Sequence, residues 1–314
     1  MKKIKYDNPI GAQIELTGRC NLKCHHCYNS SGDFGRFDIK DDAWLSFFEK
    51  LNESYSFPTV NITGGEPMLR KDLLLKVLNI FSNKNPYTRI RIMTNGYYLD
   101  KTFLEYLSLI NNPIEFQISL DGADKAEHQA VRIVRNSWEK AINSCIMVVN
   151  SGYKLQIAST ITTSNYDKIE RLFKLAVLVG ATSLGIGSAL PLGRGIRDVK
   201  GLILPSQLRE EVSMKLKALK QDYESFISVN LTSSLSEVYS KYASLEQDWL
   251  IIDHRGNVKI DTRLPYIVGN ISSKSIEELW LLVQEKYNDS IVKENITSAL
   301  DNNDIISNVE RILL

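Results

Sequence analysis

The sequence has few cysteines, no long apolar segment and almost no net charge. Only four of its 314 residues are cysteine, too few for the disulfide framework of a small secreted protein. No run of about 18 apolar residues occurs, as a membrane-spanning helix requires, and the N-terminal MKKIKYDNPI lacks the apolar core of a signal peptide. The formal net charge of +1 favours neither a nucleic-acid nor a membrane partner. We therefore expect a cytoplasmic protein.

What the sequence contains is a globular composition and a repeated strand–helix pattern. Hydrophobic residues make up 43% of the chain and charged residues 24%, as in ordinary globular proteins. Apolar runs typical of strands alternate with segments of helical period. The predicted strands are 13–17, 59–63, 89–94, 114–120, 155–161 and 183–187, and the predicted helices are 40–53, 71–83, 101–110, 137–150 and 166–179.

Six strands that alternate with helices predict an α/β fold with a parallel sheet and right-handed crossovers. Such sheets bind ligands at the C-terminal ends of their strands. After residue 187 the rhythm changes, and we place a domain boundary near residues 190–205. Beyond it the sequence predicts a helix at 205–224 and a hairpin that turns at 253–257. A second helix begins at the capping box formed by Ser275 and Glu278.

Three cysteines follow the first predicted strand at C-x3-C-x2-C spacing. Cys20, Cys24 and Cys27 can direct their sulfurs from one short loop toward a single inorganic centre. Cys thiolates hold iron–sulfur clusters, and three thiolates on a four-iron cubane leave one iron open to a non-protein ligand. The alternative is a zinc site that includes His25 or His26, because zinc accepts sulfur and nitrogen ligands. Structural zinc sites usually draw on two separated ligand pairs, and no second pair follows, so we favour the iron–sulfur site.

The cysteine motif, with Tyr28 beside its last cysteine, resembles the signature of the radical S-adenosylmethionine (SAM) superfamily. The resemblance implies a partial (β/α)6 TIM-like barrel and one [4Fe–4S] cluster held by Cys20, Cys24 and Cys27. It implies that SAM chelates the open iron and is cleaved by one electron from the cluster. The resulting 5′-deoxyadenosyl radical would remove a hydrogen atom from the substrate. No catalytic residue beyond the cluster ligands is then expected, because the cofactor carries the chemistry.

Two motifs at strand ends fit the same superfamily. Gly64-Gly65-Glu66 matches the GGE motif, in which the carboxylate would bind the amino group of SAM. Thr94-Asn95-Gly96 matches a turn that lies near the SAM ribose. Paired glycines also allow close approach of a ligand to the backbone. An incidental turn is the alternative for the glycine pair.

A third segment would bind the methionine carboxylate of SAM. Ser119 opens an S-L-D-G sequence, and Arg132 can offer its bidentate fork to a carboxylate. Ile133 replaces the glycine that usually follows this arginine, and a solvent-exposed role for Arg132, with Arg135 in its place, stays open. The SAM-binding residues that the resemblance implies are Tyr28, Gly64, Gly65, Glu66, Asn95, Ser119, Arg132, Thr160 and Gly187.

Residues 250–285 resemble the C-terminal extension called the SPASM or twitch region. Gly256, Val258 and Trp280 stand in the order of that pattern, but Asp261 occupies the position of its cysteine. The extension's auxiliary clusters need several cysteines, and none follows Cys145. We expect a radical SAM core at residues 1–195 and a small α+β extension without clusters at residues 196–314.

Radical SAM proteins with this kind of extension most often modify ribosomally made peptides. We therefore expect a peptide-modifying enzyme that forms crosslinks or epimerises residues in a precursor peptide, with flavodoxin or ferredoxin as electron donor. The first strand begins by residue 13, so we see no leader-binding domain before it. This keeps an enzyme for a small biosynthetic intermediate as the alternative. A non-catalytic binding module would not need the SAM-gripping motifs.

Cys145 lies on a predicted helix between the fourth and fifth strands. In some peptide epimerases of this superfamily a lone cysteine returns a hydrogen atom to the substrate. Barrel helices lie outside the central cavity, however, and free cysteines are among the most buried residues. We favour a packed core thiol.

Overall fold

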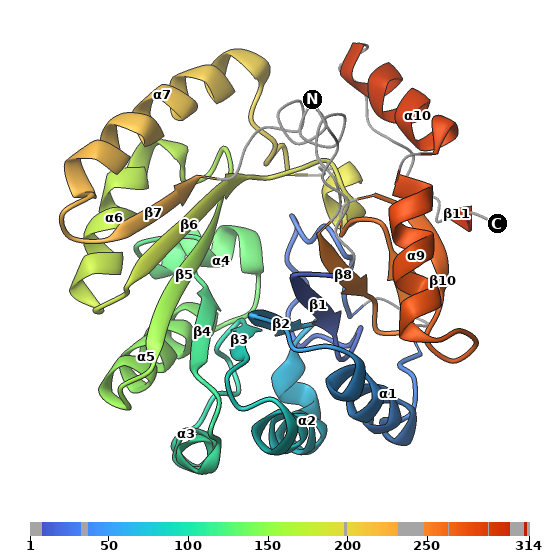
Figure 1. Ribbon diagram of the computed structural model, residues 1–314. Helices are drawn as coiled ribbons and strands as arrows, with labels where there is room; N and C mark the ends of the chain where they lie inside the picture. The colour runs from blue at the N-terminus through green and yellow to red at the C-terminus, as the bar shows by residue number, and fades with distance from the viewer. Residues whose placement is uncertain are drawn as a thin grey trace.

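The structure is a computed structural model that describes residues 8–32, 37–197, 200–231, 248–262, 264–287, 289–301 and 311–312. Its strands form one 11-stranded sheet in the order β11-β10-β9-β8-β1-β2-β3-β4-β5-β6-β7 (Figure 1). The strands are β1 (Gly11–Glu15), β2 (Thr59–Thr63), β3 (Arg89–Thr94), β4 (Ile114–Ser119), β5 (Lys154–Ile161), β6 (Ser183–Ser188), β7 (Ser228–Leu231), β8 (Trp249–Ile252), β9 (Asn257–Lys259), β10 (Tyr266–Asn270) and β11 (Arg311–Ile312).

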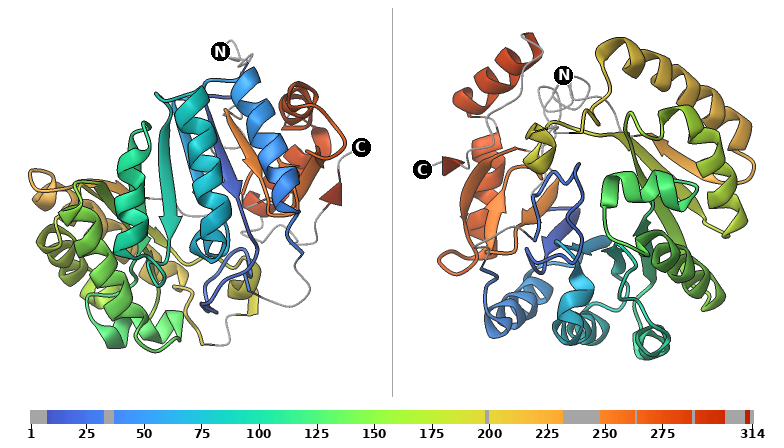
Figure 2. Two further views of the ribbon diagram at one scale, coloured as in Figure 1. Left: turned by 90° about the horizontal axis from the view of Figure 1, so that it is seen from below. Right: turned by 180° about the vertical axis from the view of Figure 1, so that it is seen from behind.

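Helices cover the outer face of this curved sheet (Figures 1 and 2). The helices are α1 (Asp41–Ser54), α2 (Lys71–Lys84), α3 (Lys101–Tyr106), α4 (Lys125–Arg132), α5 (Ser137–Asn150), α6 (Ile169–Leu178), α7 (Ser206–Tyr223), α9 (Ile276–Tyr287) and α10 (Ser290–Asp301). Short 3₁₀ helices are η1 (Pro67–Arg70), η2 (Leu107–Leu109), η3 (Tyr166–Lys168) and η4 (Gly193–Arg197). None of the helices in the described part of the chain is long and apolar enough to cross a membrane.

Alternation along the strands separates the core from the inner face. In β4, Phe116 and Ile118 are fully buried, while Gln117 between them is only half-buried. Successive side chains of a strand point to opposite faces of the sheet, so the apolar set packs beneath the helices. Each such Phe or Ile stabilises the fold by about 1.5–3 kcal/mol. The alternate side chains, such as Gln117, face the inside of the barrel, where polar residues can form a site.

The predicted partial barrel is confirmed. Strands β1 to β6 are parallel in sequence order, and the sheet stays open with β7 and β11 at its ends. The five predicted helices are present. The 3₁₀ helix η2 forms the end of the predicted helix 101–110, and η3 forms the start of the predicted helix 166–179.

The short helix α4 was missed by the sequence analysis. The side chain of Asp124 accepts a hydrogen bond from the amide of Glu127 (3.0 Å), and the Glu127 carboxylate accepts one from the amide of Ala123 (2.8 Å). This resembles a capping box, except that the glutamate accepts from the amide of the residue before the N-cap. The D-x-x-E pattern was the available signal for the start of this helix.

Segments beyond residue 195 extend the same sheet at both sides of the barrel. Strand β7 pairs in parallel with β6, and β8 pairs in parallel with β1. The predicted hairpin is the antiparallel pair β8 and β9, and the predicted capping box is present, since Ser275 and Glu278 exchange hydrogen bonds. The division into a core and a SPASM-like extension stays a prediction.

Candidate functional site: a cysteine-lined cavity in the barrel

A cavity of 470 Å³ opens at the C-terminal ends of β1 to β6. Its size is in the range of small-molecule and cofactor sites. The thiols of Cys20, Cys24 and Cys27 line it together. The predicted SAM-binding residues that also line it are Tyr28, Gly64, Gly65, Asn95, Ser119, Arg132, Thr160 and Gly187.

Glu66 is the predicted residue that the structure places elsewhere. Its side chain is fully buried and is not among the residues that line the cavity. Its carboxylate accepts hydrogen bonds from the hydroxyl of Thr94 (2.6 Å) and from the amides of Asn95 (2.7 Å) and Met68 (3.0 Å). Glu66 therefore fixes the turn that presents Asn95, and its contact with the SAM amino group stays a prediction.

The glycine pair joins its loop to the cysteine loop. The amide of Gly65 donates to the carbonyl of Thr17 (2.6 Å), and the amide of Glu66 donates to that of Arg19 (2.8 Å). A Cβ on Gly65 would lie 2.2 Å from the carbonyl oxygen of Arg19, so only glycine permits this approach. The pair thus holds the start of the cysteine loop at the cavity wall.

Asn95 also touches the cysteine loop directly. Its side-chain amide donates to the side-chain oxygen of Asn21 (2.9 Å) and reaches the sulfur of Cys20 at 3.9 Å. An amide donor near a thiolate stabilises its negative charge. The predicted neighbour of the SAM ribose therefore lies beside a cluster ligand.

Arg194, in the 3₁₀ helix η4 after β6, lies against the cysteine loop. Its backbone amide donates to the carbonyl of Cys27 (2.9 Å), and its guanidinium donates to the carbonyls of Cys24 (2.9 Å) and Ser31 (2.8 Å). The sequence analysis placed only a domain boundary near residues 190–205 and missed the role of this residue. No local pattern signals a contact between residues 170 positions apart.

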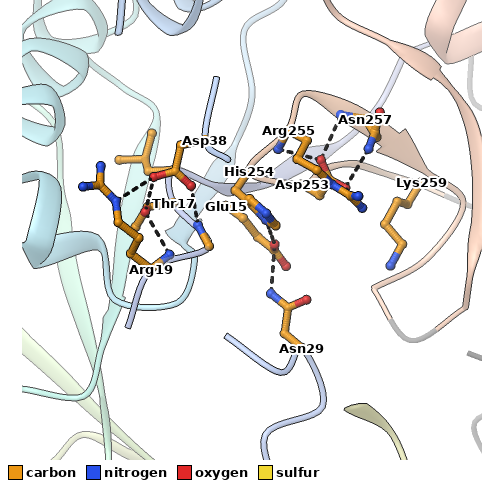
Figure 3. Close-up of polar contacts among 12 residues, drawn as sticks. Glu15, Thr17, Arg19, Asn29, Asp38, Asp253, His254, Arg255, Asn257 and Lys259 are labelled. Carbon is orange, nitrogen blue, oxygen red and sulfur yellow. Dashed lines mark hydrogen bonds and ion pairs between the residues drawn. The ribbon is translucent and has the colours of Figure 1, made fainter. Parts of the chain in front are cut away.

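The base of the cysteine loop is held by side chains from β1 and from the β8–β9 turn (Figure 3). Glu15 accepts a hydrogen bond from the side-chain amide of Asn29 (3.0 Å), and His254 Nδ1 lies 3.6 Å from the same carboxylate oxygen. Asp38 accepts hydrogen bonds from the hydroxyl of Thr17 (2.6 Å) and the amide of Gly18 (2.7 Å). The loop is thereby tied to two distant parts of the chain.

Asp121, the acid of the S-L-D-G segment, is the centre of a buried polar network. Its carboxylate accepts from Nε of Arg132 (2.7 Å) and from the amide of Thr160 (2.9 Å), and His26 Nε2 lies at 3.4 Å. Burial alone would raise the pKa of Asp121, but the charges of Arg132 and His26 outweigh it and hold the pKa at about 2. Asp121 is thus a carboxylate at neutral pH.

This network orients Arg132 toward the cluster ligands. Nη1 of Arg132 lies 3.8 Å from the sulfur of Cys24, and the residue lines the cavity. The structure therefore places Arg132 inside the site, and the solvent-exposed alternative is wrong. Arg135 is not among the residues that line the cavity. Binding of the SAM carboxylate by Ser119 and Arg132 stays a prediction.

The three thiols fit an iron–sulfur cluster. Burial raises the pKa of Cys20 to about 12 and that of Cys24 to about 11, so these sulfurs lose their protons only to a strong cation such as iron. Cys thiolates are the usual ligands of iron–sulfur clusters, and three thiols that line one cavity fit such a cluster.

Cys145 lies outside this site. It is fully buried on α5 within the hydrophobic core, and burial raises its pKa to about 12. The interpretation as a packed core thiol is confirmed.

A partial barrel that gathers three cysteines at its C-terminal edge is the architecture of an enzyme built around an iron–sulfur cluster. The family model of the radical SAM superfamily matches residues 14–176, more than half of the chain. The protein belongs to the radical SAM superfamily, and its cofactors are a [4Fe–4S] cluster and SAM.

Several characterised proteins resemble the chain. It is 27% identical over 218 residues to the sporulation killing factor maturation protein SkfB of Bacillus subtilis, covering 68% of this chain and 50% of SkfB. It is 23% identical over 287 residues to an AdoMet-dependent heme synthase of Methanosarcina barkeri, covering 85% of this chain and 80% of the synthase. The chain therefore spans half the length of SkfB, and the alignment with the synthase extends well beyond the family match.

Solved structures share the fold. Streptococcus suis SuiB bound to its precursor peptide SuiA superposes with a TM-score of 0.69 at 16% sequence identity, covering 93% of this chain and 67% of SuiB. This likeness confirms the fold of the partial barrel.

Proposed function

We propose that this enzyme removes a hydrogen atom from a residue of a precursor peptide as the first step of a crosslink or an epimerisation. A crosslink is completed when an external oxidant takes a second electron and a proton leaves, and an epimerisation is completed when an external donor returns a hydrogen atom. The observation that carries the proposal is the shared cavity, which is lined by the three thiols and by the neutral amide side chains of Gln117, Gln156 and Asn230. SkfB is a maturation protein, and SuiB binds a precursor peptide, which supports a peptide substrate. Flavodoxin or ferredoxin would supply the electron.

The chain's own residues would bind and orient the cofactors. Cys20, Cys24 and Cys27 would hold the cluster, which when bound supplies the electron that cleaves SAM into methionine and a 5′-deoxyadenosyl radical. Ser119 and Arg132 would bind the methionine carboxylate, with Asp121 fixing the guanidinium. Tyr28, Gly64, Thr160 and Gly187 would line the remaining surface of SAM.

The first experiment measures 5′-deoxyadenosine formed from SAM by the anaerobically reconstituted, dithionite-reduced protein. The matched control is Cys24→Ala, which is expected to abolish the product, whereas Cys145→Ala is expected to retain it. Co-expression with short peptides encoded beside the gene, followed by mass spectrometry, then tests the peptide substrate. A wild-type protein that binds zinc and no iron would contradict the proposal.

An enzyme for a small biosynthetic intermediate is the second candidate. The resemblance to the heme synthase, which covers 85% of the chain, favours it. A peptide that is unmodified on co-expression, from a protein that cleaves SAM, would support this alternative.

A further inference from the structure

Two glutamines lie beside each other on the inner wall of the barrel. Gln117 of β4 and Gln156 of β5 are register partners on neighbouring parallel strands, and both line the cavity that contains the three cysteines. They lie two residues before Ser119 and Ala158, which are also register partners. The pair is therefore deeper in the barrel than the residues expected to bind SAM.

The side-chain amide of Gln156 has an unused hydrogen-bonding group. Its Oε1 is buried and has no hydrogen-bond partner. On the adjacent strand β6, a Cβ on Gly185 would lie 3.0 Å from Nε2 of Gln156, so the glycine leaves room for this amide. A buried acceptor without a donor is unfavourable, and a bound molecule with an N–H group would satisfy it.

The wall around the two glutamines is neutral. Its neighbours on β3 and β7 are Met93 and Asn230. The cationic side chains that line the cavity are Arg132 and Arg194, and both already bond to groups beside the cysteine loop. Among the residues that line the cavity, none near Gln117 and Gln156 offers a cation to a substrate with several carboxylates. A neutral polar group of a substrate would fit this part of the wall.

We propose that Gln117 and Gln156 form the substrate subsite, where they bind the backbone amides of the peptide residue that loses its hydrogen atom. This inference rests on the proposed function and names the part of the substrate that the barrel recognises. Each carboxamide offers one acceptor and an NH₂ donor, the complement of a peptide N–H and C=O. Oε1 of Gln156 accepts from the peptide N–H, and the NH₂ of Gln117 donates to the carbonyl.

The test uses a minimal peptide probe, N-acetylglycine N-methylamide with deuterium at its α-carbon. The reduced, cluster-loaded full-length protein is incubated with SAM and the probe, and deuterium in the 5′-deoxyadenosine is measured by mass spectrometry. We expect deuterium transfer with the wild type and at least tenfold less with Gln117→Leu and Gln156→Leu. The matched control is Gln129→Leu. Nε2 of Gln129 is also buried without a hydrogen-bond partner, but the residue lies on α4 and is not among those that line the cavity. The Gln129→Leu variant is expected to transfer as much deuterium as the wild type.

A second probe tests the charge of the substrate with the unaltered protein. N-acetylglycine with deuterium at the same carbon carries a carboxylate in place of the second amide and is expected to transfer no deuterium. Transfer from this acid but not from the amide would overturn the subsite, as would equal transfer in the wild type and both glutamine variants. Deuterium-free product from the amide probe, with normal SAM cleavage, would overturn the subsite and leave the enzyme class intact. Absence of SAM cleavage would contradict the proposed function itself.

Discussion

Nε of Arg194 lies 2.9 Å from the carbonyl oxygen of Cys24, although 170 residues separate them in the chain. The backbone amide of Arg194 also bonds to the carbonyl of Cys27, and the residue lines the cavity beside the cysteine loop. Its charge also lowers the pKa of the Cys24 thiol, against the larger effect of burial. Arg194 thus acts on both the shape and the charge of the cluster-binding loop.

Replacing Arg194 by glutamine is expected to lower the midpoint potential of the cluster. Removal of a positive charge disfavours the reduced cluster, which carries one more negative charge. Each change of about 1 kcal/mol in the free energy of this one-electron reduction shifts the midpoint potential by about 40 mV. Arg194→Lys keeps the charge and is expected to lie nearer the wild type. The potential is measured by a redox titration followed by electron paramagnetic resonance. Identical potentials in all three proteins would contradict an electrostatic role.

Asp121→Asn is expected to destabilise the fold strongly. The change removes a buried charge and leaves the guanidinium of Arg132 uncompensated, which costs about 3–5 kcal/mol. Asp100→Asn is the matched control because Asp100 forms an exposed ion pair with Lys71 and asparagine can still cap α3. This variant is expected to lose less than about 1 kcal/mol in the free energy of unfolding. Denaturant unfolding measures the loss in the free energy of unfolding for each variant. Equal losses in the two variants would contradict the argument that burial makes Asp121 the more important charge.

Ile133→Gly is expected to stabilise the protein. Ile133 has φ +63°, a conformation unfavourable for a β-branched residue by about 1–2 kcal/mol, and its side chain is 48% exposed. Ile146 is similarly exposed but lies within α5, so Ile146→Gly is expected to cost about 1 kcal/mol. Thermal or denaturant unfolding should therefore move the two variants in opposite directions.

The stability of the protein is expected to fall below pH 6.5 in part because of His128. Burial and the charge of Arg132 lower its pKa to about 3, while the unfolded chain takes up the proton near pH 6.5. The unfolded state then binds more protons, so stability is complete above pH 6.5 and declines by about 1.4 kcal/mol per unit below it.

His128→Asn should flatten this decline. Nδ1 of His128 accepts a hydrogen bond from the amide of Asp121 (3.2 Å), and the asparagine oxygen can replace that acceptor without titrating. Between pH 7.5 and 5.5 the variant is expected to lose about 1 kcal/mol less than the wild type, measured by urea unfolding at each pH. An unchanged slope would show that other groups dominate.

The sequence predicted the features that depend on local pattern. Alternating and helical periods located the barrel strands, and the cysteine spacing located the loop that lines the cavity. The position of Ile133, where the superfamily usually has glycine, was also visible, and its φ of +63° supplies the physical reason for that glycine.

Features that depend on long-range packing were beyond local pattern. Arg194 and the Gln117–Gln156 pair acquire their positions only when distant strands close around the cavity. Glu66 was assigned to SAM from its motif, whereas its buried bonds to the next strand's turn follow from the tertiary fold. Such contacts need the register of neighbouring strands, which periodicity does not specify.

The parallel pairing of β1 with β8 has a consequence for the order in which the molecule forms. Gly11 pairs with Trp249, so the strand that leads into the cysteine loop obtains one neighbour early, from β2, and the other only after most of the chain has been synthesised. His254, whose ring packs against Gly18, arrives later still. Closing so long a loop is slow compared with local folding. The cysteine loop is therefore completed late during biosynthesis, and iron and sulfide are expected to be inserted only after the segment around His254 has emerged from the ribosome.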